Sequence, residues 1–398
     1  MSLDRGCSPR RIERGGEPAV ARHGGLHRGP HVTGTPACLR SSVLQFVASC
    51  SLPEFGPGRY RYSLACSEPT LYSSSYAAMA QSLLRALGGA DTVEWAAYLN
   101  SFQDDDGLFR DPLSYGQGWY ADDPLWCGRS HLTCHVLTAL ACLGAVAAEP
   151  LTWLEPWRNC DALVDWLEGL DWGARVGWTG NEIMNVGTLL QYARDFHNDA
   201  RAGQAIECLL DSLEQHHLNP ESGVWGSLDL TDPLQRSHAV QAAYHWWPLF
   251  AYDRRPFPHV DRAVDTVLAT QNPRGGFGWG VHNPAEPFGS SACEDIDSID
   301  PLARMLSQTD HRRDEVRAAL RRGGEWVLRN QQPDGGFVFC LGRAFEYGHP
   351  QLRGEAGQGA MFPTWFRLLS LALVGRALLD SPLGQLSWQF VNCPGMQF

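Results

Sequence analysis

The sequence contains no lysine, and all 32 of its basic residues are arginine. Its 44 acidic residues outnumber them, so the chain has a formal net charge of −12, and no basic stripe runs along any part of it. Proteins that bind nucleic acid meet its phosphates with clustered positive charge, so this balance argues against a nucleic-acid partner. We attribute the absence of lysine to a GC-rich coding bias rather than to function.

Long apolar runs are also absent, and none approaches the roughly 18 residues of a membrane-spanning helix. The first 40 residues lack the apolar core of a secretory signal, and Asp4, Glu13 and Glu17 are unlike a transit peptide. We therefore expect residues 1–40 to be a disordered tail or the product of an upstream start codon, and the protein to be cytoplasmic. The 12 cysteines include no CxxC pair, so we expect reduced thiols.

What the sequence does contain is a repeated unit of about 50–60 residues. In each copy a helical segment ends in a Gly-rich turn with an aromatic residue, and a helix with a polar start follows. These turns fall within 98–109, 166–178, 213–226, 267–280 and 327–339. No region alternates with period two, so we expect little sheet. We predict one nearly all-α domain over residues 41–398, built of helical hairpins that close into a toroid or stack as a solenoid.

Three of the turns resemble the QW motif of the squalene and terpene cyclase superfamily, which joins an outer helix to the next inner helix. The fullest copy is QNPRGGFGWG (271–280), QQPDGGF (331–337) is shorter, and QDDDGLF (103–109) is weaker. The resemblance implies the α-α toroid shared by triterpene cyclases, class II diterpene cyclases and protein prenyltransferase β subunits. We expect the turn residues to be structural staples, namely Gln271, Gly275, Gly276, Phe277 and Trp279.

In such a toroid the polar starts of the inner helices face a central cavity. They include His131 with His135 and Asn181 with Asn185, each pair spaced i,i+4 on one helical face, and also His238. We expect these five residues to shape a substrate-binding site. A simpler interpretation stays open, because histidines often lie in cores and Asn181 could cap a helix.

The stretch SSACEDIDSIDPL (290–302) has four carboxylates in seven positions, Glu294, Asp295, Asp297 and Asp300. The simplest interpretation is an acidic helix start, stabilised by the helix macrodipole. Residues 295–298, DIDS, also resemble the DxDD motif of class II terpene cyclases, with Ser298 in place of the last Asp. The resemblance implies that Asp297 protonates an alkene or epoxide, supported by Asp295 and tuned by Glu294 and Asp300. Burial beside other carboxylates would keep this acid protonated.

The leading prediction is a terpene-cyclase-like enzyme that cyclises an isoprenoid or related apolar substrate after protonating it, without a cofactor. Aromatic residues of the inner helices would stabilise the carbocation by cation–π attraction, and the candidates are Trp246, Trp247, Phe362, Trp365 and Phe366. A triterpene cyclase has two helical domains, whereas this chain has room for one. A small isoprenoid, a homo-oligomer or a partner chain is then needed to complete the cavity.

Three other functions fit parts of the sequence. A prenyltransferase-like enzyme would need catalytic zinc, held by Cys293, Asp295 and one of His131, His135, His238 or His349. A carbohydrate-active α/α toroid would use carboxylate, His, Asn and Trp side chains in an open cleft. A toroid whose centre is filled by side chains would be a non-catalytic binding protein.

Overall fold

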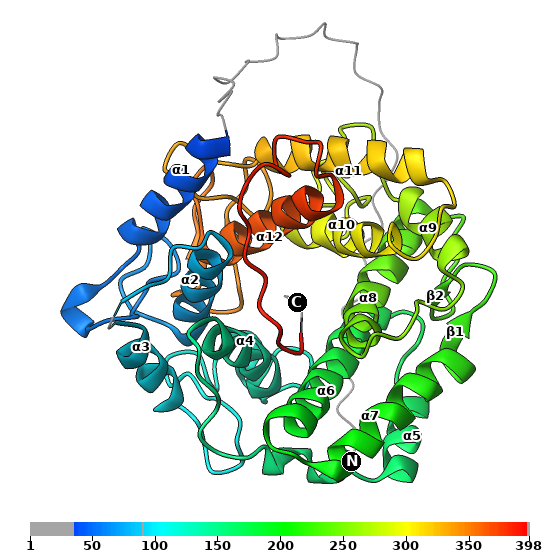
Figure 1. Cartoon of the computed structure of the whole chain (residues 1–398), viewed down its shortest axis with the longest axis horizontal. Helices are drawn as coiled ribbons and strands as arrows, with labels where there is room; N and C mark the ends of the chain where they lie inside the picture. The colour runs from blue at the N-terminus through cyan, green and yellow to red at the C-terminus, as the bar shows by residue number, and fades with distance from the viewer. Residues whose placement is uncertain (1–35, 90, 396–398) are drawn as a thin grey trace, which may run out of the picture. The chain divides into compact units, whose positions relative to one another are not determined.

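The computed structural model describes residues 36–89 and 91–395. Within them, helical hairpins form a closed ring of two concentric layers (Figure 1). The inner layer consists of α2 (Leu71–Leu83), α4 (Arg129–Cys142), α6 (Val176–Phe196), α8 (Pro233–Tyr252), α10 (Ala292–Met305) and α12 (Met361–Ala377). The outer layer consists of α1 (Pro36–Ser49), α3 (Asp91–Asn100), α5 (Cys160–Glu168), α7 (Ala200–Ser212), α9 (Val260–Leu268) and α11 (Arg313–Leu328). The chain alternates between the layers, so each hairpin contributes one helix to each.

Each inner helix lies beside the next, and α12 lies beside α2, which closes the ring. Inner helices such as α12 are buried on nearly all sides, because they lie between the outer layer and the centre. The outer helices α5, α7, α9 and α11 bury one apolar stripe and leave the opposite side polar. This architecture confirms the predicted all-α toroid.

Sheet is confined, in the described residues, to two short antiparallel pairs. One pairs β1 (Leu218–Asn219) with β2 (Val224–Trp225), and the other pairs β3 (Phe345–Glu346) with β4 (Arg353–Gly354). None of the helices that the structure describes has both the length and the apolar content that a membrane span requires. Of the tail expected at residues 1–40, residues 1–35 lie outside the described residues, and 36–40 belong to α1.

Three Gly-aromatic turns share one geometry. Each begins with a Gln whose backbone pairs with that of a Phe six residues later, as in Gln103–Phe109, Gln271–Phe277 and Gln331–Phe337. The Gln side chain donates to the carbonyl of a Gly four residues on. That glycine has a positive φ, 87° at Gly107, 98° at Gly275 and 92° at Gly335, which other residues rarely adopt. A β-carbon at Gly335 would lie 2.1 Å from Ser42 O of α1, so the turn requires glycine for close packing too.

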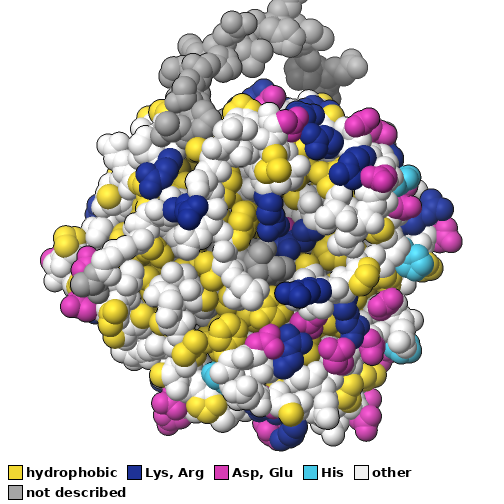
Figure 2. Space-filling model, in the orientation of Figure 1, with side chains coloured by type: hydrophobic (Ala, Val, Ile, Leu, Met, Phe, Trp, Pro, Cys, Tyr) yellow, Lys and Arg dark blue, Asp and Glu magenta, His cyan; other side chains and the backbone are white. Residues whose placement is uncertain are grey.

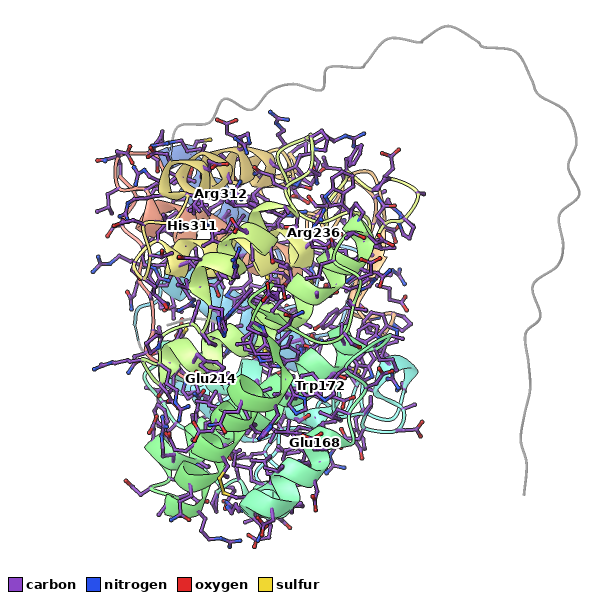
Figure 3. The ribbon with its side chains drawn as sticks, turned by 90° about the vertical axis from the view of Figure 1, so that its right-hand side faces the viewer. Glu168, Trp172, Glu214, Arg236, His311 and Arg312 are labelled. Carbon is purple, nitrogen blue, oxygen red and sulfur yellow. A yellow bond between two sulfur atoms is a disulfide. The ribbon has the colours of Figure 1, made fainter. Side chains whose placement is uncertain are left out.

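The expectation of reduced thiols is wrong for one pair of cysteines. Cys160 in α5 and Cys208 in α7 form a disulfide between two outer helices, the yellow bond near the lower edge of Figure 3. These residues are 48 positions apart, so a search for close spacing such as CxxC could not pair them. They meet because consecutive outer helices lie next to each other in the toroid.

The segment that follows α12 crosses the middle of the ring, as the red trace of Figure 1 shows. The backbone N–H of Gln389 donates to Leu83 O, the last residue of α2. Cys393 is fully buried, and Gly395 lines a small internal cavity beside His135. This segment therefore covers the ring at the C-terminal ends of its inner helices.

Candidate functional site

A cavity of about 120 Å³ lies among the N-terminal halves of the inner helices. Its walls come from α4, α6, α8, α10 and α12, and from the loops that precede α4, α10 and α12. About half of the lining residues are aromatic: Trp119, Trp126, Trp178, Tyr244, Phe339, Phe345, Tyr347, Phe362 and Phe366. Trp119 and Trp178 are each 43% exposed, whereas Phe362 and Phe366 are buried. Aromatic rings therefore form part of both the exposed and the buried walls of the cavity.

The remaining lining residues are mostly polar: Cys127, His131, His135, Asn181, Met184, Gln241, His245, His282, Cys293 and Asp297. Four of the predicted site residues are among them, His131, His135, Asn181 and Asp297. The polar starts of three different inner helices thus meet in one cavity, as we expected from the repeat.

Asp297 is the one acid among the described residues that line the cavity. Its side chain is buried, and its Oδ2 has no hydrogen-bond partner among the described residues. Burial raises its pKa well above the usual 3.8, and the nearby Glu294, Asp295 and Asp300 raise it further. Burial therefore favours the protonated carboxyl over the carboxylate, because the charged form would have no counter-ion among the described residues that surround it.

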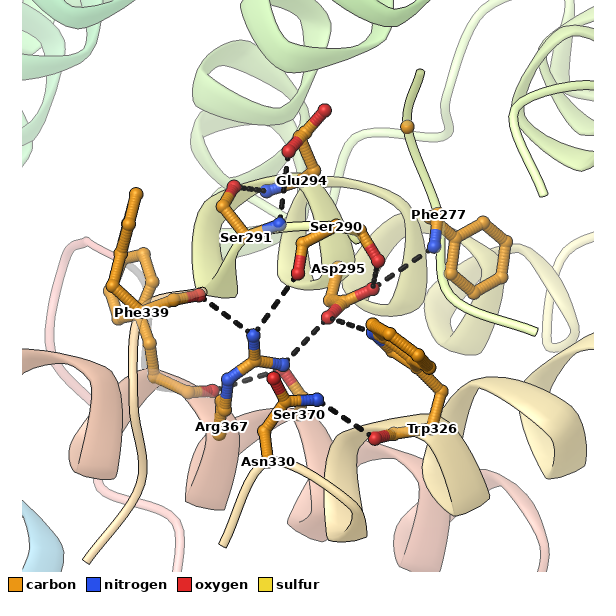
Figure 4. Close-up of polar contacts among 12 residues, drawn as sticks. Phe277, Ser290, Ser291, Glu294, Asp295, Trp326, Asn330, Phe339, Arg367 and Ser370 are labelled. Carbon is orange, nitrogen blue, oxygen red and sulfur yellow. Dashed lines mark hydrogen bonds and ion pairs between the residues drawn. The ribbon is translucent and has the colours of Figure 1, made fainter. Parts of the chain in front are cut away.

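Asp295 faces away from the cavity and anchors three structural elements (Figure 4). Its Oδ2 accepts hydrogen bonds from Arg367 Nη1 of α12 at 2.7 Å and from Trp326 Nε1 of α11 at 3.0 Å. Its Oδ1 accepts from the Phe277 backbone N–H at 3.0 Å and from Ser290 Oγ at 2.9 Å. Burial raises the pKa of Asp295 above its usual 3.8, and the charge of Arg367 and the hydrogen bonds to the carboxylate offset only part of this rise. With four donors directed at it, Asp295 is ionised, and its negative charge helps to keep Asp297 protonated.

Glu294 and Asp300 are also committed to local structure. Glu294 forms a capping box with Ser291 at the start of α10, and it accepts from the backbone N–H of Gly280 and Val281. Burial raises its pKa, but the side chain of His282 and the hydrogen bonds from Ser291 bring the pKa below its usual value. Asp300 forms a bidentate ion pair with Arg304 one turn later, at 2.6 and 3.3 Å. Of the four carboxylates, Asp297 alone is left for chemistry in the cavity.

Histidines form the wall of the cavity on α4. His131 Nδ1 lies 2.8 Å from Tyr72 Oη of α2, and its Nε2 lies 3.4 Å from His135 Nε2. Burial lowers the pKa of His131 well below 6.5, that of His135 to about 3 and that of His245 on α8 to about 4. These three rings are therefore uncharged at neutral pH, and they can donate or accept hydrogen bonds.

Four predicted binding residues do not line this cavity. Asn185 donates to Leu125 O at 2.8 Å and so holds the loop before α4. His238 lies in the second turn of α8, which begins at Pro233. The helix lines the cavity further along, at Gln241 and His245. Trp246 follows His245 but turns about 100° away, and it contacts the rings of Trp172 and Trp225. Trp365 stacks on Tyr76 and lines the smaller cavity.

Sequence reasoning also missed several lining residues. Gln241 and His245 share one face of α8 with i,i+4 spacing, which is the same sequence signal as His131 and His135 on α4. Trp119, Trp126, Phe345 and Tyr347 come from loops and from β3. No periodicity marks these residues in the sequence, because the ring alone brings the loops over the cavity.

The zinc set of the prenyltransferase alternative does not come together. Cys293 lines the cavity, but Asp295 is held by Arg367 on the other side of α10. His349 is not among the lining residues, and His131 and His135 face each other. In the described residues no group of three or more His, Cys, Asp and Glu side chains is placed to hold a metal ion.

No protein-family model matches the sequence. A lanosterol synthase of Aspergillus fumigatus is 28% identical over 148 residues, which are 33% of this chain. The chain spans about a fifth of that synthase's length.

Among solved structures, an unsaturated glucuronyl hydrolase from Bacillus sp. GL1 aligns with 88% of this chain and 97% of its own, with a TM-score of 0.50 and 10% identity. A type II terpene cyclase from Scytonema, solved with geranylgeranyl dihydroxybenzoate, aligns with 87% of this chain and 97% of its own, with a TM-score of 0.45 and 13% identity. The chain is thus an α/α toroid whose sequence is similar to part of a lanosterol synthase, in keeping with its resemblance to the squalene and terpene cyclase superfamily.

Proposed function

We propose that this chain is a terpene-cyclase-like enzyme in which Asp297 protonates an alkene or epoxide of an isoprenoid. The observation that carries the proposal is the Asp297 carboxyl, which is buried, has a raised pKa and leaves Oδ2 unpaired among the described residues of an aromatic cavity. A carboxylic acid that keeps its proton near neutral pH can transfer it to carbon, which an ionised Asp cannot do.

Proton transfer would form one bond to hydrogen on the substrate and leave a carboxylate at Asp297 and a carbocation in the cavity. Aromatic rings attract such a cation through their faces, typically by about 0.5–2 kcal/mol each. Tyr244, Phe362 and Phe366 line the cavity together with Asp297 and supply such rings. When the final cation releases a proton, the product is a cyclic isomer of the substrate, and Asp297 must regain its proton before the next cycle.

A carbohydrate-active enzyme is the second candidate, because the aligned hydrolase has the same fold. The exposed rings of Trp119 and Trp178 would suit the stacking of sugars at the cavity mouth. Glycosidases that follow the usual mechanism use two carboxyl groups, about 5–10 Å apart. Asp297 has no such partner among the described lining residues, so the cyclase proposal is the stronger of the two.

The proposal can be tested by incubating the full chain in D₂O with squalene, epoxysqualene and neutral prenylated compounds, followed by mass spectrometry. We expect a cyclic product with one deuterium, and a loss of at least about 100-fold in rate for Asp297→Asn, the usual range for removal of a general acid. Asp310→Asn is the matched control, because the Asp310 side chain is 91% exposed. Cleavage of an oligosaccharide panel, with no isoprenoid product, would replace this proposal with the second candidate.

A further inference from the structure

The cavity carries no positive charge that could bind an anionic head group. The sequence has no lysine, and none of the arginines in the described residues lines the cavity. Three arginines lie within two residues of a lining residue, Arg129, Arg343 and Arg367. Arg129 forms ion pairs with three aspartates, Arg343 hydrogen-bonds Asn283, and Arg367 pairs with Asp295. All three are therefore already engaged.

The titratable groups of the cavity do not supply a cation either. Burial lowers the pKa of His131, His135 and His245, so these rings are neutral. Nδ1 of His282 lies 3.7 Å from the buried carboxylate of Glu294, which balances any charge on that ring. An anion that entered would lose hydration without gaining a cationic partner, which costs several kcal/mol per charge.

Arginines gather instead at the opposite ends of the inner helices. On the face shown in Figure 2, dark blue side chains, all of them arginine, lie around the central hollow. A separate open pocket there is lined by Arg254, Arg255, Arg304, Arg313 and Arg376. The helix macrodipole explains this placement, because α8, α10 and α12 all end at this pocket. These five arginines thus line a pocket other than the one that holds Asp297.

Two amide side chains offer a different kind of contact. Asn181 of α6 and Gln241 of α8 line the cavity from neighbouring helices, and both are half-buried. Among the described residues, neither amide side chain has a hydrogen-bond partner, so their donors and acceptors remain available. An amide pairs well with a hydroxyl or a carbonyl group, and less well with a multiply charged phosphate.

We infer that the cavity takes an isoprenoid whose polar group is uncharged, a hydroxyl or a carbonyl held by Asn181 and Gln241, and that it rejects prenyl diphosphates. The inference rests on the proposed function, because it names the substrate class of the same cavity. The substrate would lie with its alkene or epoxide at Asp297 and with its neutral polar group between α6 and α8.

The test compares geranylgeraniol with geranylgeranyl diphosphate, which share one tail and differ in the head group. Binding is measured by equilibrium dialysis on the full chain with Asp297→Asn, so that turnover does not interfere. We expect the alcohol to bind at least about 100-fold more tightly, equivalent to about 2.7 kcal/mol. Gln241→Arg adds a cation to the cavity wall and should reduce the ratio of alcohol to diphosphate affinity at least about 10-fold. Gln204→Arg adds the same charge on the exposed side of α7 and should leave it unchanged.

Each outcome has a distinct meaning. Tighter binding of the diphosphate to the chain with Gln241 in place would overturn the inference and leave the cyclase proposal standing. Failure of both probes to bind would overturn the inference and the proposed function together. An equal effect of Gln204→Arg and Gln241→Arg would show that overall charge, not the cavity, sets the preference, which also overturns the inference.

Discussion

We expect Asp297 to lower the stability of the folded protein, in addition to its proposed role as the general acid. Its pKa is raised by burial and by three neighbouring carboxylates, so the native state holds a proton that the unfolded chain releases above about pH 3.8. Linkage then makes the free energy of unfolding fall as pH rises from the unfolded pKa towards the raised native value. The proposed reaction needs the same proton, so we expect activity also to fall as the pH passes through the raised pKa.

We expect Asp297→Asn to remove this pH-dependent loss of stability. Its melting temperature should exceed that of the unaltered chain by at least about 2 °C at pH 8. The difference should be smaller at pH 4, where ionisation of Asp297 in the unfolded chain contributes little to the free energy of unfolding. Thermal melts followed by circular dichroism at several pH values measure the difference. A difference in melting temperature that is the same at all pH values would show that Asp297 has the same pKa in the folded and the unfolded chain.

The Asp295–Arg367 pair is the other residue-scale test. Both side chains are fully buried, and Arg367 also donates to Val338 O and Phe339 O (Figure 4). Arg367→Met would leave the Asp295 charge buried without its counter-ion, so we expect a loss of about 3–5 kcal/mol in urea unfolding. Arg313→Met is the control, because it removes an exposed ion pair that is worth at most about 1 kcal/mol. Equal losses in the two variants would contradict the assigned anchoring role.

At the scale of elements, the disulfide ties α5 to α7. It joins residues 48 positions apart, and closing a loop of that length in the unfolded chain is worth about 4 kcal/mol by the chain-entropy estimate. We therefore expect a reducing agent to lower the urea midpoint of the protein. The double variant Cys160→Ser/Cys208→Ser should have the urea midpoint of the reduced protein both with and without the reductant, because it has no disulfide to break. A response that persists in the double variant would assign the effect to another cysteine pair.

At the scale of the whole molecule, the segment after α12 covers one end of the ring. A β-carbon at Gly375 of α12 would lie 2.6 Å from Leu383 O, so this segment lies directly on the helix. Leu383 and Cys393 are buried, and Gly395 lines the small cavity that shares His135 and Met184 with the main one. The segment therefore separates the inner end of the main cavity from solvent.

Ending the chain at Asp380 should open this end of the ring. We expect a loss of about 3–6 kcal/mol in urea unfolding, at 1.5–3 kcal/mol for each buried apolar side chain removed, and stronger fluorescence of an apolar dye such as ANS. A chain that ends at Gly395 keeps Leu383 and Cys393 and serves as the control. Equal dye fluorescence from the two truncated chains would mean that other residues cover the cavity.

Much of the fold and part of the site follow from local sequence patterns. A Gln and a Gly four residues apart define each turn, because the turn forms within a single short segment. The i,i+4 spacing places His131 and His135 on one face of α4, and both line the cavity. The same spacing misleads for Asn181 and Asn185, because Asn185 donates to Leu125 O in a neighbouring loop, whereas Asn181 and Met184 line the cavity. Spacing indicates the face of a helix on which a residue lies, but not the partner that its side chain meets there.

The sequence by itself determined that the chain is helical, repetitive and without lysine, and that four carboxylates cluster near the start of one helix. Only the tertiary structure decided which of them remains available for chemistry. Arg367 lies 72 residues from Asp295, and Arg304, His282 and the Gly280 turn engage the other two. Arg367 and Trp326 reach Asp295 from distant segments when the ring closes, whereas nearby residues hold Glu294 and Asp300, and Asp297 faces the cavity.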